Sequence, residues 1–219
     1  YNYDYGLYLA KLGYTVICPD PRGFGERREK AMQGDEGDKY LKSSCKELSQ
    51  SALALGFTLQ GLLVWDIMRL IDYIETRDDI TIEDLGVIGF SGGGMQALYA
   101  SALDQRIRKV MISGYFYGFE DSLLDLNSNC QCNYVPSLFT LFDMGDIASL
   151  IAPRPLAIQS CLRDHLEGRR GMENVTEQLE ILKKSYDLFN KPIFHDTPEG
   201  DHAFHKERLN ELLSFFEKE

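Results

Sequence analysis

The fold is decided by the segment Leu85-Gly-Val-Ile-Gly-Phe-Ser-Gly-Gly-Gly-Met-Gln-Ala-Leu-Tyr-Ala-Ser-Ala-Leu103. It begins with a short apolar run typical of a buried strand, and residues 94–103 form a helix-like run. Between them, Gly89-Phe-Ser-Gly-Gly93 matches the pattern G-x-S-x-G. In a strand–turn–helix setting this pattern presents a serine nucleophile. We therefore predict a sharp turn at Ser91 that holds its hydroxyl clear of the sheet.

The residue types around Ser91 suit such a turn. A nucleophile at a sharp turn must tolerate a strained backbone, and Gly89 and Gly93 lack the Cβ atoms that would keep strand and helix apart. The N–H of Gly92 is placed to donate to an oxyanion at the helix N-terminus. The alternative is a turn that cradles a phosphate. It is disfavoured because the sequence here has neither Gly-Lys-Ser/Thr nor G-x-G-x-x-G.

Further strands and helices alternate on both sides of this motif. Continuous apolar runs are typical of strands that are covered on both faces, and apolar residues spaced by three and four are typical of one helix face. Their alternation predicts an α/β fold with a mainly parallel sheet. The additional predicted strands span 14–20, 108–113, 155–160 and 192–196, and the additional predicted helices include 59–74, 175–189 and 209–216.

A serine hydroxyl needs a base, and the chain has only four histidines. In this fold the order along the chain is Ser, then Asp or Glu, then His. His202 lies in a Gly-bearing loop after the last predicted strand, where the base is expected. His205 is the alternative, although it falls near the start of the last helix. His195 lies inside a predicted strand, and His165 precedes any loop that fits the order.

The acid is expected directly after the predicted strand at 155–160. Asp164 occupies that position, and Glu167 is the runner-up. Asp143 and Asp146 come before that strand, so we interpret them as cap or helix-capping residues. The acid would hold the base in the required tautomer and stabilise its protonated form.

Composition limits the class of protein. The chain has 219 residues and a formal net charge of −11. This length favours one domain with an ample core, so residues 1–219 are predicted to form a single catalytic domain. The acidic balance argues against a nucleic-acid partner, and no apolar stretch approaches the roughly 18 residues of a membrane span. Residues 115–150 are too long for a simple connection and could form a cap.

The five cysteines do not suggest a disulfide framework. Cys18 lies in an apolar run and is predicted to be a small buried hydrophobe. Cys130-Gln-Cys132 could suggest a metal, but no second pair follows at zinc spacing. The sequence therefore predicts no metal site and no cofactor, and a reduced protein located in the cytoplasm.

Two clusters flank the predicted site. Tyr115-Phe-Tyr117 follows the strand at 108–113, and Tyr115 and Tyr117 could either line the mouth of a substrate pocket or belong to the core. Arg22, Glu26 and Arg27 follow the strand at 14–20. For them, an ion pair that pins the loop is favoured over contact with substrate.

Several motifs together resemble the α/β-hydrolase superfamily, in the branch of dienelactone hydrolases and acetyl-xylan-esterase-like proteins. The resemblance implies a three-layer α/β-hydrolase fold and a serine esterase acting on small carboxylic esters, including acyl groups on carbohydrate, without a cofactor. The serine departs from dienelactone hydrolases proper, which use cysteine. The matching motifs are Asp20-Pro-Arg-Gly-Phe-Gly25, Gly89-Phe-Ser-Gly-Gly93, Asp143-Met-Gly-Asp146, Leu150-Ile-Ala-Pro-Arg-Pro155, Ser160 to Asp164 and Gly200-Asp-His-Ala-Phe-His205.

The resemblance also has a gap. The family's first strands, and the loop after its third strand that supplies a second oxyanion donor, have no counterpart here. The strand at 15–20 would be the family's fourth and that at 86–90 its fifth, which leaves a slot between them. We therefore expect a further N-terminal segment. Two alternatives stay open: a peptidase or thioesterase using the same residues, and a non-catalytic binding module. The sequence does not indicate an oligomeric state.

Overall fold

The computed structural model describes residues 4–30, 42–127 and 129–218. Its centre is a parallel sheet in which each strand pairs with the next along the chain. The predicted α/β architecture with a mainly parallel sheet is thus confirmed. The strands are β1 (Gly86–Phe90), β2 (Lys109–Ser113), β3 (Leu156–Gln159) and β4 (Phe194–Asp196).

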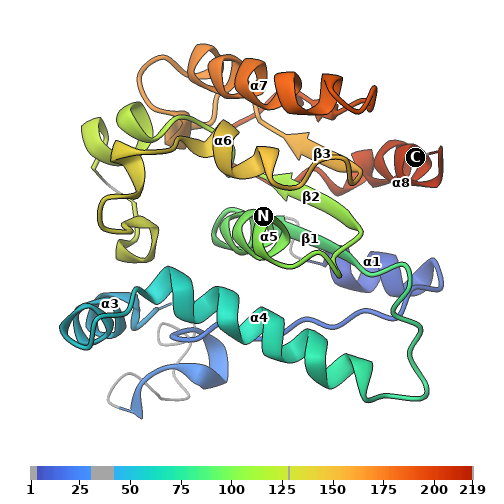
Figure 1. Ribbon diagram of the computed structural model, residues 1–219, viewed down its shortest axis with the longest axis horizontal. Helices are drawn as coiled ribbons and strands as arrows, with labels where there is room; N and C mark the ends of the chain where they lie inside the picture. Colours follow the sequence, from blue (N-terminus) through green and yellow to red (C-terminus); the bar gives the residue numbers. More distant parts are fainter. Residues whose placement is uncertain (1–3, 31–41, 128, 219) are drawn as a thin grey trace.

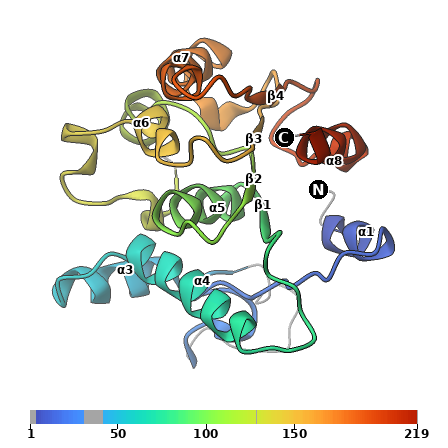
Figure 2. The same ribbon diagram turned by 45° about the vertical axis from the view of Figure 1, so that its right-hand side comes forward.

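Helices cover both faces of this sheet, which gives three layers (Figures 1 and 2). One face carries α5 (Gly92–Leu103), α6 (Met144–Ser149) and α7 (Met172–Asp187). On the same side, α4 (Leu59–Glu75), preceded by α3 (Cys45–Ala54), packs beside α5 past the β1 end of the sheet. The other face carries α1 (Tyr5–Lys11) and α8 (Leu209–Lys218). The predicted helices at 59–74, 175–189 and 209–216 correspond to α4, α7 and α8.

Burial differs among the strands. Every residue of β3 is buried, as are the last four of β2, which matches strands covered on both faces. β1 lies at one end of the strand order, and only its last two residues, Gly89 and Phe90, are buried. The buried end of β1 is therefore the end that leads into Ser91.

The predicted strand at 14–20 is wrong. These residues form no strand, and they run from α1 toward α4 without pairing with β1 (Figure 1). Tyr14 and Ile17 are 47% and 42% exposed, and Cys18 is also exposed rather than buried. An apolar, β-branched run becomes a strand only where a neighbour satisfies its N–H and C=O groups. Among the described residues, β1 has no such neighbour on this side.

The segment 115–150, which the sequence suggests as a cap, packs against the main body of the fold. Before α6 it contains the π-helical η3 (Glu120–Asp125) and the single 3₁₀ turns η4 (Gln131–Asn133) and η5 (Leu138–Thr140). Several of its apolar side chains, among them Phe116, Phe119 and Leu123, join the core cluster of α5 and α7. Asp143 and Asp146 form a reciprocal capping box at the start of α6, as their interpretation as capping residues predicts.

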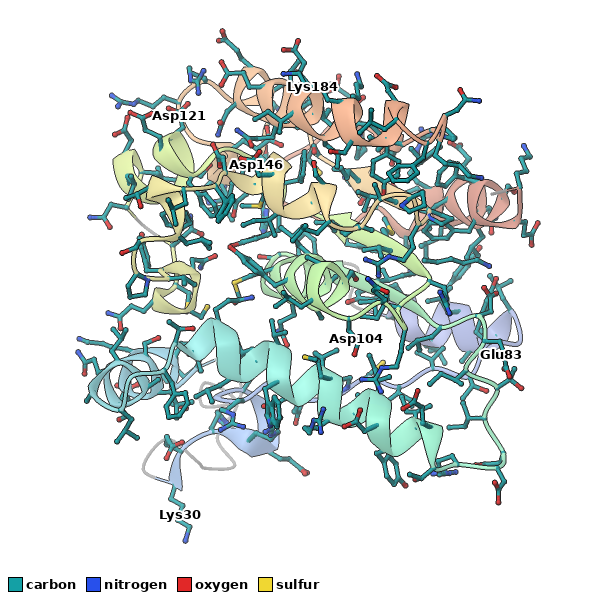
Figure 3. All side chains as sticks on the ribbon, viewed as in Figure 1. Lys30, Glu83, Asp104, Asp121, Asp146 and Lys184 are labelled. Atoms are coloured by element: carbon teal, nitrogen blue, oxygen red, sulfur yellow. The ribbon has the colours of Figure 1, made fainter. Side chains whose placement is uncertain are left out.

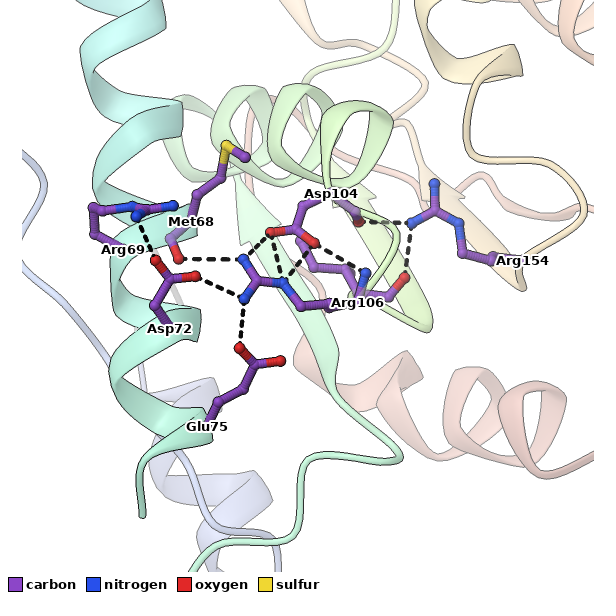
Figure 4. A network of polar contacts seen from close by, with 8 residues as sticks. Met68, Arg69, Asp72, Glu75, Asp104, Arg106 and Arg154 are labelled. Carbon is purple, nitrogen blue, oxygen red and sulfur yellow. Dashed lines mark hydrogen bonds and ion pairs between the residues drawn. The ribbon is translucent and has the colours of Figure 1, made fainter.

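An ion-pair network fixes α4 and the end of α5 (Figure 4). Arg106 reaches Asp72 of α4 at 2.7 Å and the buried Asp104 at 2.6 Å. The hydrogen bond from Arg106 lowers the pKa of Asp104. Arg154 donates to carbonyls at the C-terminal end of α5, where a cation is favourable. The helix α5, which directly follows Ser91, is thus anchored at its far end.

Most charged side chains lie at the surface. Lys30, Glu83 and Lys184 point outward, whereas Asp104 lies between α4 and α5 (Figure 3). Among the described residues, no single helix is long and apolar enough to cross a membrane; α3 and α4 meet the criteria only as a pair, and they are bent by 98° to each other.

Candidate active site

Ser91 occupies the sharp turn between β1 and α5. Its φ is 54° and its ψ −118°, a strained backbone for a residue with a side chain. The Ser91 N–H donates to the Ser113 carbonyl at 2.8 Å, which ties the turn to the end of β2. A Cβ on Gly89 would overlap the Gly93 carbonyl, so Gly89 permits the close approach of the helix. A Cβ on Gly93 would meet nothing within 4 Å, so the role predicted for its missing side chain is wrong.

Gly92 is the first residue of α5. An N–H at this position has no carbonyl one turn earlier to bond. Gly92 also lines the same pocket as Ser91. The N–H therefore lies where the positive end of a helix dipole favours developing negative charge, which suits the oxyanion role predicted for Gly92.

Asp164 and His202 meet across two loops. His202 Nδ1 lies 2.6 Å from Asp164 Oδ2, and the two side chains are 10% and 1% exposed. The other carboxylate oxygen of Asp164 accepts the Leu166 N–H at 2.9 Å. Because each oxygen of the buried Asp164 carboxylate has a hydrogen-bond partner, its orientation is fixed. The contact with Nδ1 leaves Nε2 of the His202 ring facing away from Asp164.

The two loops are joined because the sheet ladder continues past its strands. The Leu162 and Arg163 N–H groups donate to the Pro198 and Gly200 carbonyls, each at 3.0 Å. Parallel strands carry their following loops to the same edge of the sheet. The acid after β3 and the base after β4 are therefore brought side by side.

Two buried polar side chains at the end of β3, those of Gln159 and Cys161, bond to the loop that carries His202. Gln159 Oε1 accepts the Ser113 hydroxyl at 2.9 Å and the His205 N–H at 3.0 Å. The Cys161 thiol donates to the Ala203 carbonyl at 3.3 Å. Gln159 and Cys161 were not singled out by the sequence, because nothing in it marks which polar residues at strand ends point into the core.

The runner-up residues lie elsewhere. His205 Nδ1 pairs with Glu207 at 2.7 Å, and His165 is exposed with its ring centroid 6.1 Å from that of His202. Glu167 is 2% exposed, and its Oε2 has no hydrogen-bond partner among the described residues. Burial, followed by the negative charge of Asp164, raises the pKa of Glu167 to about 8. Glu167 is thus a neutral neighbour of Asp164 below that pH.

A pocket of about 420 Å³ opens in front of Ser91 and His202. This volume lies in the range of sites for small molecules. Its walls are mostly apolar, with few polar groups converging on Ser91. The lining residues are Pro21, Phe24, Leu63, Phe90, Ser91, Gly92, Gly93, Met95, Gln96, Cys132 and His202.

Tyr115 and Tyr117 do not line this pocket. Their side chains are 3% and 1% exposed, and they join the core. Gly114 has a φ of +60°, a conformation open to glycine that turns the chain inward after β2. The suggestion that these tyrosines form the pocket mouth is therefore wrong, and the core alternative holds. The Tyr115 hydroxyl instead donates to Asn133 Oδ1 at 2.6 Å.

The loop at 21–27 is pinned by ion pairs, as predicted. Arg22 bonds both carboxylate oxygens of Asp66 on α4 at 2.7 and 3.1 Å, and Arg27 adds a contact at 2.8 Å. Burial opposes the ionisation of Asp66, but the hydrogen bond and charge of Arg22 outweigh it and lower the pKa. Because Pro21 and Phe24 belong to this loop, the ion pairs fix one wall of the pocket.

The prediction of no metal site rested on Cys130 and Cys132 alone. In the structure Cys45 joins them, and the three sulfur atoms lie within 4.8 Å of one another. Sequence spacing does not indicate this cluster, because Cys45 belongs to a different element.

Comparisons with known proteins support the fold described above. A family model described as the alpha/beta hydrolase fold matches residues 3–129. A protein of Bacillus subtilis (strain 168) named "Putative hydrolase YtaP" is 31% identical over 176 residues, which cover 80% of this chain and 54% of that protein.

Two solved structures share the fold. A "putative acetyl xylan esterase" from Bacteroides fragilis NCTC 9343 has a TM-score of 0.68 at 20% identity, covering 89% of this chain and 49% of that chain. A carbohydrate esterase family 15 glucuronoyl esterase from Caldicellulosiruptor kristjansonii has a TM-score of 0.61 at 21% identity, covering 73% and 49%. The chain thus spans about half the length of the relatives it matches. Because the matched family model spans more than half of the chain, the chain belongs to the α/β-hydrolase-fold family.

Proposed function

We propose that the protein is a serine esterase that cleaves small carboxylic esters through an acyl-enzyme. One observation carries the proposal: Ser91, at a strained strand-to-helix turn, shares a pocket with His202, whose Nδ1 lies 2.6 Å from the buried Asp164. A nucleophile, a base and a group that orients the base are the three parts that acyl transfer by a serine requires.

In the first half of the reaction, Ser91 Oγ attacks the ester carbonyl carbon while His202 Nε2 takes the hydroxyl proton. Negative charge develops on the carbonyl oxygen, and the Gly92 N–H donates to it. The tetrahedral intermediate collapses, the carbon–oxygen bond of the leaving alcohol breaks, and His202 returns the proton to that alcohol.

In the second half, water attacks the acyl-enzyme and His202 takes its proton. Collapse of the second intermediate releases the carboxylic acid and restores the Ser91 hydroxyl. Asp164 acts throughout by accepting the Nδ1–H bond of His202. This bond keeps the Nε2 lone pair facing the pocket and stabilises the protonated ring.

The surroundings of the pocket support an alcohol half rich in hydroxyl groups, such as an acylated carbohydrate. A second pocket of about 340 Å³ shares Pro21, Leu63 and Gln96 with the first. Its lining includes Asp66 and Arg69, charged groups that can bond hydroxyls. The apolar first pocket suits the acyl group, and the charged second pocket suits the sugar. The names of the two solved relatives point to the same substrate class.

The proposal is tested by turnover of a panel of short-chain aryl esters, acetylated sugars, thioesters and aminoacyl amides by the full-length protein. We expect hydrolysis of the esters, with the acetylated sugars among the substrates. Ser91→Ala should lower kcat by on the order of 10⁴-fold or more. Ser101→Ala, a buried serine of the same helix outside the pocket, is the matched control.

Three results would count against the esterase. Turnover of amides or thioesters alone would favour the peptidase or thioesterase. An absence of all turnover in folded protein would favour the binding module. Equal turnover by the Ser91→Ala variant would remove Ser91 from the mechanism.

A further inference from the structure

Three cysteine side chains from two distant parts of the chain converge beside the pocket. Cys45 is the first residue of α3, and Cys130 and Cys132 flank Gln131 in the segment 115–150. All three are free thiols, and their sulfur atoms lie within 4.8 Å of one another. Cys45 and Cys132 are buried, at 2% and 5% exposure, and Cys130 is exposed.

This spacing suits three ligands of one ion. Zinc–sulfur bonds of about 2.3 Å in tetrahedral geometry place two sulfur atoms roughly 3.8 Å apart. A disulfide needs two of them at about 2.05 Å and leaves the third sulfur without a partner. The cluster therefore has the number and spacing of donors for a thiolate metal site.

A buried hydrogen-bond chain orients the cluster. Asn133 Nδ2 donates to the Cys130 carbonyl at 2.8 Å and lies 3.8 Å from Cys132 Sγ. Asn133 Oδ1 in turn accepts the Tyr115 hydroxyl at 2.6 Å. Groups that fix the ligating side chains from behind are the usual support of metal sites. These hydrogen bonds explain why polar side chains, Asn133 and Tyr115, occupy buried positions.

The location of the cluster gives it a structural role. Cys132 lines the pocket that contains Ser91 and His202, and Cys45 begins the helix that precedes α4. An ion held by both would fasten the turn η4 to α3. One wall of the pocket would then be fixed by the metal rather than by packing alone.

We propose that Cys45, Cys130 and Cys132 bind one thiophilic metal ion, Zn²⁺ being the best match, with water as the fourth ligand. Three thiols release their protons to solvent on binding, and no oxidation or reduction takes place. The ion holds the wall of the pocket and takes no part in the acyl transfer. This site is independent of the proposed function and stands or falls by metal binding alone.

The test is titration of the reduced, metal-free full-length protein with Co²⁺ and then with Zn²⁺. We expect one Co²⁺ per chain, with thiolate-to-cobalt charge transfer and intense tetrahedral d–d bands that Zn²⁺ bleaches. Zn²⁺ should also raise the melting temperature. Cys130→Ser should weaken binding by on the order of 100-fold or more, and Asn133→Ala by about 10- to 100-fold.

The variants are chosen to keep the fold. Cys130 is exposed, so its replacement by serine disturbs no packing, and Cys18→Ser, an exposed cysteine outside the cluster, should bind as the wild type does. The proposal is overturned if the wild-type protein, with all five thiols shown to be reduced, gives no charge-transfer band on addition of Co²⁺. It is also overturned if the Cys130→Ser and Cys18→Ser variants bind Co²⁺ equally tightly. A disulfide within the cluster of protein isolated with reductant, with no metal uptake, would also overturn it.

Discussion

The phenyl ring of Phe90 packs against the imidazole of His202, with ring centroids 4.7 Å apart and ring planes inclined at 32°. The residue before the candidate nucleophile thus supports the candidate base. Gly114 lies against the same pair, since a Cβ there would be 2.9 Å from Phe90 Cε2 and 3.0 Å from His202 Cε1. Asp164 orients the ring through Nδ1, and Phe90 and Gly114 limit its position from the side.

Gly114→Ala should therefore displace His202. The positive φ alone costs about 1–2 kcal/mol of stability, and a misplaced base should lower kcat by on the order of 100-fold. Gly56→Ala is the matched control, because Gly56 has a φ of +80° and a Cβ there meets nothing within 4 Å. Steady-state kinetics and melting temperature separate the two. Equal kcat losses in both variants would contradict the proposed contact with His202.

Asp164→Asn should lower kcat by on the order of 10⁴-fold while the melting temperature shows a retained fold, because an amide can hold His202 in the wrong tautomer. Glu167→Gln, the runner-up acid, should keep kcat within a few-fold at pH 7, since Glu167 is neutral there. Kinetics of both variants on one aryl ester check the assignment. The reverse order of effects would make Glu167 the acid.

Glu167 should make folding stability depend on pH. Its pKa is about 8 in the folded chain against an ordinary value of 4.5. Between these two pH values the Glu167 carboxyl is protonated in the folded chain and ionised in the unfolded chain. Its contribution to the free energy of unfolding is therefore fully present below the unfolded pKa. That contribution is lost as pH rises through the folded pKa, by at most about 1.4 kcal/mol per pH unit. Glu167→Gln removes this loss.

Urea unfolding of wild type and Glu167→Gln at several pH values from about 5 to 9 measures the effect. The variant should gain stability over the wild type as pH rises. The exposed Glu83→Gln is the control, and it should show a constant difference. A constant difference for Glu167→Gln as well would refute the raised pKa.

Asp66→Asn should loosen the loop that carries Pro21 and Phe24. The Arg22 pair is about a quarter exposed on average, so we expect a loss of about 1 kcal/mol. Because the pKa of Asp66 is lowered, this stabilisation is present above the ordinary carboxyl pKa and is lost as pH falls through the folded value. KM should rise several-fold with little change in kcat.

The control is Asp79→Asn, which breaks an exposed ion pair with Arg77 outside the pocket. Kinetics at neutral pH on a short-chain aryl ester, which offers no sugar hydroxyls to Asp66, and unfolding at several acidic pH values check both parts. If the Asp66→Asn and Asp79→Asn variants have the same KM, the loop does not form the pocket wall.

Much of the site was predictable because its parts are local. The apolar run before Ser91 and the glycines after it specify a strand–turn–helix within a few residues, and the structure has this turn. Chain order then limited the acid and the base to the loops after β3 and β4. Parallel strands bring such loops together, so Asp164 and His202 could be paired without knowledge of their side chains.

The errors arise where a residue's environment is set by distant parts of the chain. Residues 14–20 have the composition of a strand, but no strand among the described residues lies where they could pair with it. Tyr115 and Tyr117 enter the core because Gly114 turns the chain inward. Cys45 meets Cys130 and Cys132 only through the packing of α3 on the turn η4. Periodicity and spacing do not report such contacts.

The central claim is that Ser91 is a nucleophile activated by His202. Reaction of the full-length protein with a fluorophosphonate, followed by intact mass and peptide mapping, tests it most directly. We predict one adduct per chain, located on Ser91, slowed strongly by Asp164→Asn and absent in Ser91→Ala. A folded wild-type protein that stays unlabelled, or that carries the adduct on another residue, would contradict the claim.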